Sequence, residues 1–149
     1  MPLGSFLYRA EDDRPILMVA TGTGIAPIKA IAESLLEDSW RPPIVLYWGI
    51  RTEEDIFLGQ VFEEWEKRSE AFRYVPVLSR PRSDWVGRRG YVQDAVLADI
   101  PDLSEYSTYL CGAPAIIVDA KQKFLARGAS SSNFYVEGFT PGASKLTQE

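Results

Sequence analysis

The chain has 149 residues, of which 46% are hydrophobic and 25% charged, which is typical of one globular domain and not of a disordered segment. The net charge of −5, without a basic cluster, argues against nucleic acid as a partner, and no apolar run approaches the roughly 20 residues of a membrane helix. No histidine is present and Cys111 is the single cysteine, which excludes an internal disulfide, His-dependent triads and most zinc sites, and fits a reducing cytoplasm.

Residues 1–11 are too few to form a core of their own. We interpret them as the tail of a structure that lies N-terminal to a domain spanning residues 12–140. An ordinary disordered terminus is the alternative interpretation. Residues 141–149 are predicted to be a C-terminal tail, and no metal site is predicted anywhere in the chain.

The stretch around residues 16–27 predicts a buried strand, a glycine turn and a helix. Five consecutive apolar residues, 16–20, favour a strand that is covered on both faces. Gly22 and Gly24 follow, and Pro27 is suited to the first turn of a helix. One apolar helical face is then predicted from the spacing of Ile28, Ile31, Ala32 and Leu35.

A strand that runs through glycines into a helix N-terminus can form an anion site. The free N–H groups of residues 21–24 and the hydroxyls of two threonines, Thr21 and Thr23, could hold a pyrophosphate. The glycine pattern is Gly-x-Gly-x-x-Pro, whereas the dinucleotide fingerprint has glycine at the last position. By itself the pattern therefore leaves a plain turn between strand and helix as the alternative.

Four further strands are predicted, at residues 44–49, 72–79, 107–111 and 133–137. Pro76 cannot donate to a ladder, so the strand that contains it is expected at a sheet edge. Helices between these strands are predicted from apolar residues at helical spacing, namely Leu58, Val61, Phe62 and Trp65, then Val92, Ala95 and Val96, then Ile117, Ala120 and Phe124.

This strict alternation predicts an α/β fold, a doubly wound five-stranded parallel sheet in the order 3-2-1-4-5 with helices on both faces. The strand order reverses between strands 1 and 4, and ligands of such sheets bind at that point. The glycine turns at residues 21–24 and 111–114 face each other there, which favours a nucleotide site.

The loop after the third strand offers an adenosine site. Its candidate contacts are Ser79, Arg80, Arg88, Arg89 and Tyr91. The tyrosine could stack on the base, and an arginine could meet the ribose or its phosphate. A solvated basic loop, with the tyrosine packed on a helix start, is the interpretation that the residues alone favour.

Two further places at the same crevice are candidates. Cys111 is small enough for a flat cofactor ring to approach closely, although a buried structural cysteine is the commoner case. Glu137 could relay a proton and Phe139 could cover a flat ring. The alternative is an acidic strand end with a half-exposed aromatic residue.

Five motifs occur in order along residues 12–140: Gly22-Thr23-Gly24-Ile25-Ala26-Pro27, Tyr47-Trp48-Gly49-Ile50-Arg51, Gly87-Arg88-Arg89-Gly90-Tyr91-Val92-Gln93, Cys111-Gly112-Ala113-Pro114 and Tyr135-Val136-Glu137-Gly138-Phe139. In these motifs the chain resembles the NAD(P)-binding domain of the ferredoxin–NADP reductase superfamily. The closer likeness is to the reductases of multicomponent oxygenases and to CDP-6-deoxyglucoseen reductase.

The resemblance implies a role for each motif. Residues in the cofactor-binding set would be Thr21, Gly22, Thr23, Gly24, Pro27, Arg51, Ser79, Arg80, Arg89, Tyr91, Cys111, Gly112 and Pro114. Cys111 would lie by the nicotinamide, while Glu137 and Phe139 would lie near the flavin, so that these three form the catalytic set. Hydride would pass from NAD(P)H to FAD, and electrons would leave for an iron–sulfur centre or an oxygenase.

The flavin domain of the superfamily carries an Arg-x-Tyr-Ser or Arg-x-Tyr-Thr motif on a β-barrel, and this sequence has neither. Residues 2–6 resemble the very end of that barrel. FAD is therefore expected only with a separate N-terminal flavin-binding domain. NADH is favoured, with NADPH as the alternative. A non-catalytic nucleotide sensor or docking module of the same fold is the competing hypothesis.

Overall fold

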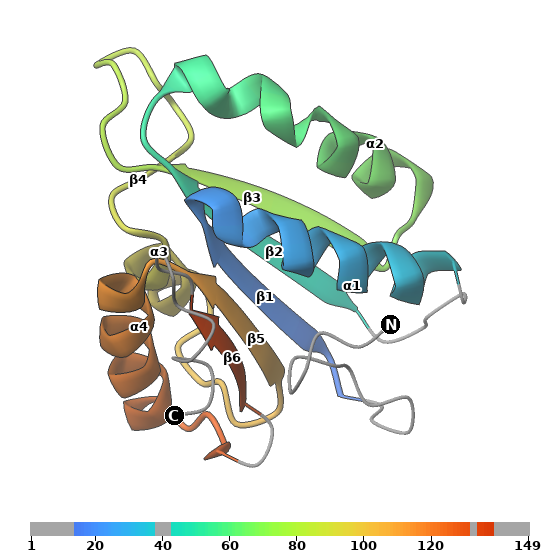
Figure 1. Ribbon diagram of the computed structural model, residues 1–149, viewed down its shortest axis with the longest axis vertical. Coiled ribbons are helices and arrows are strands. Elements are labelled where there is room, and N and C mark those ends of the chain that lie inside the picture. The colour runs from blue at the N-terminus through green and yellow to red at the C-terminus, as the bar shows by residue number, and fades with distance from the viewer. Residues whose placement is uncertain (1–13, 38–42, 132–133, 139–149) are drawn as a thin grey trace.

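Six parallel strands form one sheet in the order β4-β3-β2-β1-β5-β6 (Figure 1). The computed structural model describes residues 14–37, 43–131 and 134–138. The strands are β1 (Ile16–Thr21), β2 (Ile44–Ile50), β3 (Phe72–Leu78), β4 (Arg88–Arg89), β5 (Ser107–Gly112) and β6 (Phe134–Gly138). The predicted α/β fold and the order of its five core strands are confirmed. Both predicted tails, residues 1–11 and 141–149, lie outside the described residues.

The edge position predicted for the strand with Pro76 is correct for only part of that strand. The two-residue strand β4, which the sequence did not predict, pairs with Val77 and Leu78. Pro76 pairs with Trp48 of β2 and precedes the residues that β4 covers. The N–H that proline lacks is therefore not required by β4, which explains why proline is accepted in a strand that is no longer outermost.

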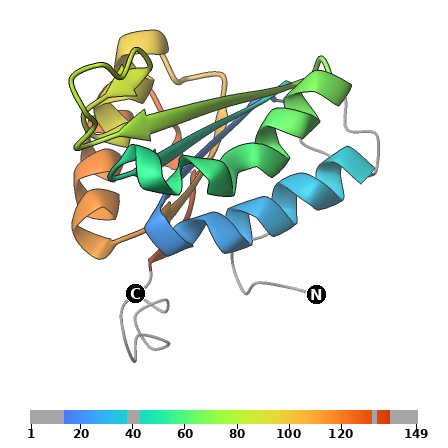
Figure 2. The same cartoon turned by 90° about the horizontal axis from the view of Figure 1, so that it is seen from above.

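The helical segments are η1 (Gly22–Gly24), α1 (Ile25–Glu37), η2 (Glu53–Gly59), α2 (Gln60–Arg68), α3 (Val92–Asp99) and α4 (Pro114–Ala126). Helices α1 and α2 cover one face of the sheet, and α3 and α4 cover the other (Figures 1 and 2). Strand β1 is buried on both faces: Met18 belongs to the core under α1, and Val19 to the core under α4. A strand with no polar alternation fits this central position.

Helix α1 begins at Ile25, directly after the 3-10 turn, and Pro27 lies within its first turn, as predicted. The second helix differs from the prediction. Leu58 was expected on the buried face of the second helix, but it lies in η2 and is 52% exposed. Helix α2 begins at Gln60, and only then do Phe62 and Trp65 enter the core, packed edge to face. No helix within the described ranges is long and apolar enough to cross a membrane.

Candidate functional site

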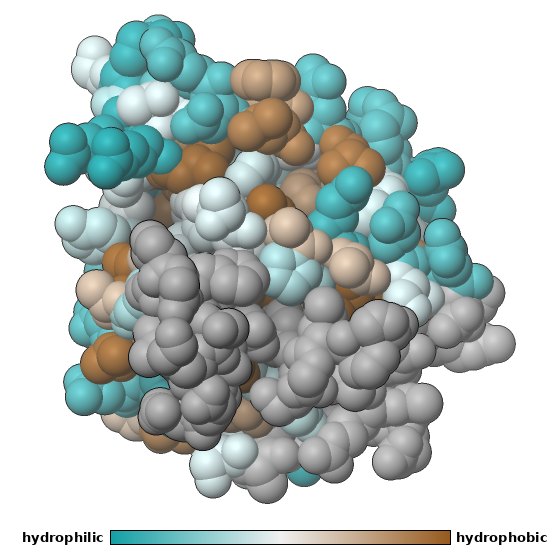
Figure 3. All heavy atoms as spheres, viewed as in Figure 1, coloured by the Kyte–Doolittle hydropathy of each residue, from teal (hydrophilic) through white to brown (hydrophobic). Residues whose placement is uncertain are grey.

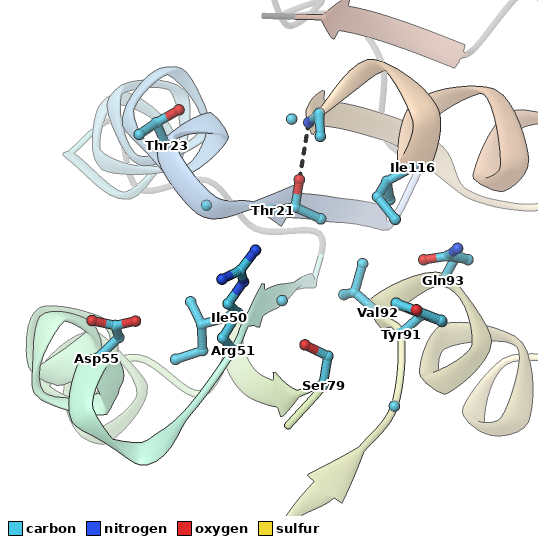
Figure 4. A pocket seen from close by; sticks show the side chains of 15 residues that line it. Thr21, Thr23, Ile50, Arg51, Asp55, Ser79, Tyr91, Val92, Gln93 and Ile116 are labelled. Atoms are coloured by element: carbon cyan, nitrogen blue, oxygen red, sulfur yellow. Dashed lines mark hydrogen bonds between the residues drawn. The ribbon is translucent and has the colours of Figure 1, made fainter. Parts of the chain in front are cut away.

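A cavity of about 570 Å³ lies where β1, β2, β3 and β5 end (Figure 4). Ligand sites in open parallel sheets are found at this place, and the volume suits an elongated small molecule. The lining residues are Thr21, Gly22, Thr23, Gly49, Ile50, Arg51, Asp55, Ser79, Gly90, Tyr91, Val92, Gln93, Gly112, Ala113 and Ile116.

The cavity brings together seven residues of the predicted cofactor-binding set: Thr21, Gly22, Thr23, Arg51, Ser79, Tyr91 and Gly112. The other predicted members do not line it, namely Gly24, Pro27, Arg80, Arg89, Cys111 and Pro114. The backbone of Glu137 pairs with that of Cys111, which places the residue at the end of β6. The side chain of Glu137 and all of Phe139 lie outside the described part of the chain.

The glycine turn after β1 has a backbone that only a few residue types adopt readily. Gly22 has φ +51°, and an added Cβ there would meet no atom within 4 Å. Its carbonyl oxygen accepts a hydrogen bond of 3.1 Å from the indole N–H of Trp48. The hydrogen bond from Trp48 of β2 therefore holds the turn in place. Because glycine has no side chain, the space beside Gly22, which lines the cavity, stays open.

The two glycine turns are joined to each other. The N–H of Ala113 donates to Oγ1 of Thr21 over 3.1 Å, and Figure 4 draws this bond across the upper wall of the cavity. Gly112 permits the approach, because a Cβ on it would lie 3.1 Å from the backbone nitrogen of Thr21. The turns that the sequence predicted to face one crevice are therefore in direct contact.

Gly24 serves packing and does not contact the cavity. It is buried, and an added Cβ would lie 2.6 Å from the carbonyl carbon of Cys111. Cys111 is itself fully buried in the core under α1. Close contact between the start of the first helix and β5 therefore accounts for glycine at this position.

The arginines after β3 are largely engaged within the protein. The guanidinium of Arg89 donates to the carbonyl oxygens of Ser83 (3.0 Å), Arg82 (3.2 Å) and Trp85. Arg88 forms an ion pair with Asp99. Arg80 is exposed and does not line the cavity. Among the residues that line the cavity, Arg51 is the cation and Asp55 is the anion.

Tyr91 is 58% exposed and lines the cavity at the start of α3. Gln93 was given no role by the sequence, yet it lines the same end of the cavity and is only 2% exposed. A buried glutamine in a short helix leaves no distinct sequence pattern, because its burial depends on the neighbouring helix α4.

A second, more apolar groove of about 450 Å³ adjoins the cavity and shares Gly22, Thr23, Ile50 and Asp55 with it. Its outer wall includes Leu58, and hydrophobic atoms gather over η2 in Figure 3. The neighbouring Phe57 is 58% exposed. A large apolar surface next to a ligand cavity is typical of a contact surface for another domain or protein.

The lining of the cavity fits a dinucleotide. Its glycine turn leaves open space at the N-terminus of a helix, where anions are stabilised. The hydroxyls of Thr23 and Ser79 and the cation of Arg51 can bind phosphates and ribose, while Tyr91 offers a ring for a base.

Comparison with known proteins agrees with this geometry. Residues 18–122 match the family model described as "Oxidoreductase NAD-binding domain". The chain is 38% identical over 140 residues to CDP-6-deoxy-L-threo-D-glycero-4-hexulose-3-dehydrase reductase of Yersinia pestis, covering 94% of this chain and 42% of the relative. It is 31% identical to the anthranilate 1,2-dioxygenase electron transfer component of Acinetobacter baylyi, covering 93% of this chain and 40% of the relative.

Among solved structures, the cytochrome P450 reductase GcoB of Amycolatopsis superposes with a TM-score of 0.86 at 33% identity. The match covers 95% of this chain and 43% of that protein. The chain thus spans about two fifths of the length of each of these three relatives.

Proposed function

The chain belongs to the family of oxidoreductase NAD-binding domains, and on this basis we propose that it positions NADH for hydride transfer to FAD in a flavin-dependent reductase. The observation that carries the proposal is the cavity at the reversal of strand order, framed by two glycine turns joined through Thr21 and Ala113.

The residues of the chain supply binding and orientation in this proposal. Backbone N–H groups of the turn at Gly22 and the hydroxyl of Thr23 would hold the pyrophosphate, with Arg51 as the counter-charge. Tyr91 would stack on the adenine and Ser79 would bind its ribose. When bound, the dinucleotide supplies the hydride, and the protein keeps its ring oriented and shielded from water.

The nicotinamide end is proposed from the resemblance described above. Cys111 would lie by the nicotinamide through the backbone at the end of β5, since its side chain is buried. Glu137 and Phe139 would lie near the flavin, which a separate flavin-binding domain would hold. These three roles depend on the matched motifs and not on a contact described here.

Discrimination between the two nicotinamide nucleotides follows from charge. A 2′-phosphate needs free cations beside the adenosine ribose. Arg88 and Arg89 are both engaged within the protein, and Arg80 does not line the cavity. We therefore favour NADH over NADPH.

The further partners are a flavin-binding domain and an electron acceptor, either an iron–sulfur protein or an oxygenase. The names of relatives support this part, because one is the electron transfer component of a dioxygenase. The exposed apolar groove beside the cavity also supports a protein partner on that side.

Calorimetric titration of the chain with NADH and then NADPH tests the proposal. We expect saturable binding that is tighter for NADH and is lost in Gly22→Asn, because asparagine tolerates the positive φ while its side chain enters the cavity. Gly128→Asn is the matched control, since Gly128 also has positive φ (+98°) but does not line the cavity. No binding of either nucleotide at millimolar concentration would overturn the proposal in favour of a docking module.

A second measurement concerns the hydride step. In the reductase that contains both this chain and its flavin-binding domain, NADH should bleach the flavin absorbance, and Gly22→Asn should slow this reduction. Binding without flavin reduction would favour a nucleotide sensor.

A further inference from the structure

Gln93 has a side-chain oxygen that finds no hydrogen-bond partner among the residues that the structure describes. The residue is 2% exposed, its Oε1 is buried without a hydrogen-bond partner, and it lines the cavity. Leaving a buried acceptor unpaired costs about 1–3 kcal/mol, so an unpaired acceptor beside a cavity points to a donor on a ligand. In Figure 4 the oxygen of Gln93 is turned toward the cavity.

The orientation of this amide is set by Asp119 of helix α4. Nε2 of Gln93 donates to Oδ2 of Asp119 over 2.7 Å. Hydrogen bonds from Gln93 and from Lys123 lower the pKa of Asp119, so the group is an ionised carboxylate at neutral pH. A carboxylate only accepts hydrogen bonds, so the amide must present its NH₂ group to Asp119 and its oxygen to the opposite side.

Outside the cavity, the carboxylate of Asp119 also forms an ion pair with Lys123, which in turn pairs with Asp94. Nζ of Lys123 lies 3.1 Å from Asp119, one helical turn earlier in α4, and 2.9 Å from Asp94 of α3. Asp94 therefore contacts the same lysine as Asp119. It has no contact with Gln93 among the hydrogen bonds described, which makes it a matched control for Asp119.

The end of the cavity at Gln93 suits a flat base better than a phosphate. Its neighbours in the lining are the ring of Tyr91 and the apolar side chains of Val92 and Ile116, whereas Arg51 and Thr23 lie toward the other end (Figure 4). Of the groups on an adenine base, the 6-amino group is the hydrogen-bond donor, and the ring nitrogens are acceptors. Because Oε1 is buried, contact requires a small movement of side chains here.

We propose that Asp119 is a positioning residue that holds the Gln93 oxygen toward the cavity, where it accepts a hydrogen bond from the 6-amino group of adenine. The inference rests on the proposed function and adds to it the means by which the adenine base is selected. Asp119 itself would not touch the ligand. Its effect would be on selectivity and not on the presence of binding.

The test compares the dissociation constants of NADH and reduced nicotinamide hypoxanthine dinucleotide, which has an oxo group in place of the 6-amino group. We expect the unaltered chain to bind the hypoxanthine analogue about tenfold more weakly, because two acceptors would then face each other. In Asp119→Asn the amide of Gln93 can turn either way, so this ratio should fall close to one. Asp94→Asn should keep the ratio of the unaltered chain.

Gln93→Met, which removes the oxygen at nearly constant length, should also bring the ratio close to one. A ratio near one in the unaltered chain would overturn the inference while leaving the proposed function intact. A tenfold ratio that survives Asp119→Asn but not Gln93→Met would overturn the positioning role. Absence of NADH binding would overturn the proposed function and this inference together.

Discussion

The start of the first helix lies directly on the end of β5: an added Cβ on Gly24 would lie 2.6 Å from the carbonyl carbon of Cys111 and 2.8 Å from Cα of Gly112. These neighbours are backbone atoms, which cannot turn aside as the end of a long side chain can. The glycine is therefore required by the fold, although its place in a glycine motif suggested contact with a phosphate.

We expect Gly24→Ala to lower the free energy of unfolding by about 1–3 kcal/mol, the usual cost of overpacking a core. Urea denaturation followed by circular dichroism measures this value. Gly22→Ala provides the comparison, since its Cβ meets no atom within 4 Å and only the backbone strain of about 1–2 kcal/mol applies. A smaller loss in Gly24→Ala than in Gly22→Ala would contradict this account.

The bond between Thr21 and Ala113 gives a second prediction. Thr21→Val keeps the shape of the side chain but removes the acceptor for the Ala113 N–H, so we expect a loss of about 1 kcal/mol and weaker NADH binding. Chemical denaturation and calorimetry measure the two effects.

Thr108→Val is the matched control for Thr21→Val. The buried Oγ1 of Thr108 has no hydrogen-bond partner in the described part of the chain, so removing it should leave stability unchanged or slightly higher. Equal losses in the two valine variants would show that the bond to Ala113 contributes nothing.

Arg89 is expected to stabilise its loop and not to select the nucleotide. Its guanidinium binds carbonyl oxygens of residues 82, 83 and 85, so Arg89→Met should speed hydrogen exchange in that loop. The ratio of NADPH to NADH affinity should stay unchanged. Arg51→Met, by contrast, should weaken binding of both nucleotides, because Arg51 lines the cavity. A lower ratio of NADPH to NADH affinity in Arg89→Met would show that Arg89 does select the nucleotide, and unchanged hydrogen exchange would disprove the loop role.

Alkaline pH should destabilise the protein through two buried tyrosines. Burial raises the pKa of Tyr74, with a smaller contribution from Glu63, and burial also raises the pKa of Tyr47. The folded state then holds both phenols neutral, whereas an unfolded tyrosine ionises near pH ~10. Stability is therefore complete below pH ~10 and falls as the pH rises above it.

Tyr74→Phe should reduce this alkaline loss, and Tyr47 should account for the part that remains. At neutral pH the variant should be as stable as the unaltered chain or slightly more so, because no described residue forms a hydrogen bond with the buried Tyr74 hydroxyl. Melting temperatures at pH 7 and above pH 10 measure both effects. An unchanged alkaline loss in Tyr74→Phe would refute the assignment to Tyr74.

Local pattern was sufficient to predict the five core strands, most of the buried faces and the order of these strands. The apolar run at residues 16–20 and the helical spacing from Ile28 to Leu35 each reflect the burial of a single segment. Both can therefore be recognised in the sequence alone. The carboxyl ends of β1 and β5 then had to meet, because parallel strands and right-handed crossovers leave few arrangements. Thr21, Gly22, Thr23 and Gly112 followed from that reasoning, whereas Arg51 was expected only from the family resemblance.

The tertiary structure alone decided which partner each polar group has. Thr21 bonds to a residue 92 positions away, and Gln93 to one 26 positions away. Arginine at position 89 is the residue type expected for a phosphate contact. Its loop folds back, however, and the guanidinium of Arg89 donates its hydrogen bonds to backbone carbonyl oxygens. Burial periodicity is a property of one segment, whereas a hydrogen bond depends on the distance between two segments, and that distance exists only once the chain has folded.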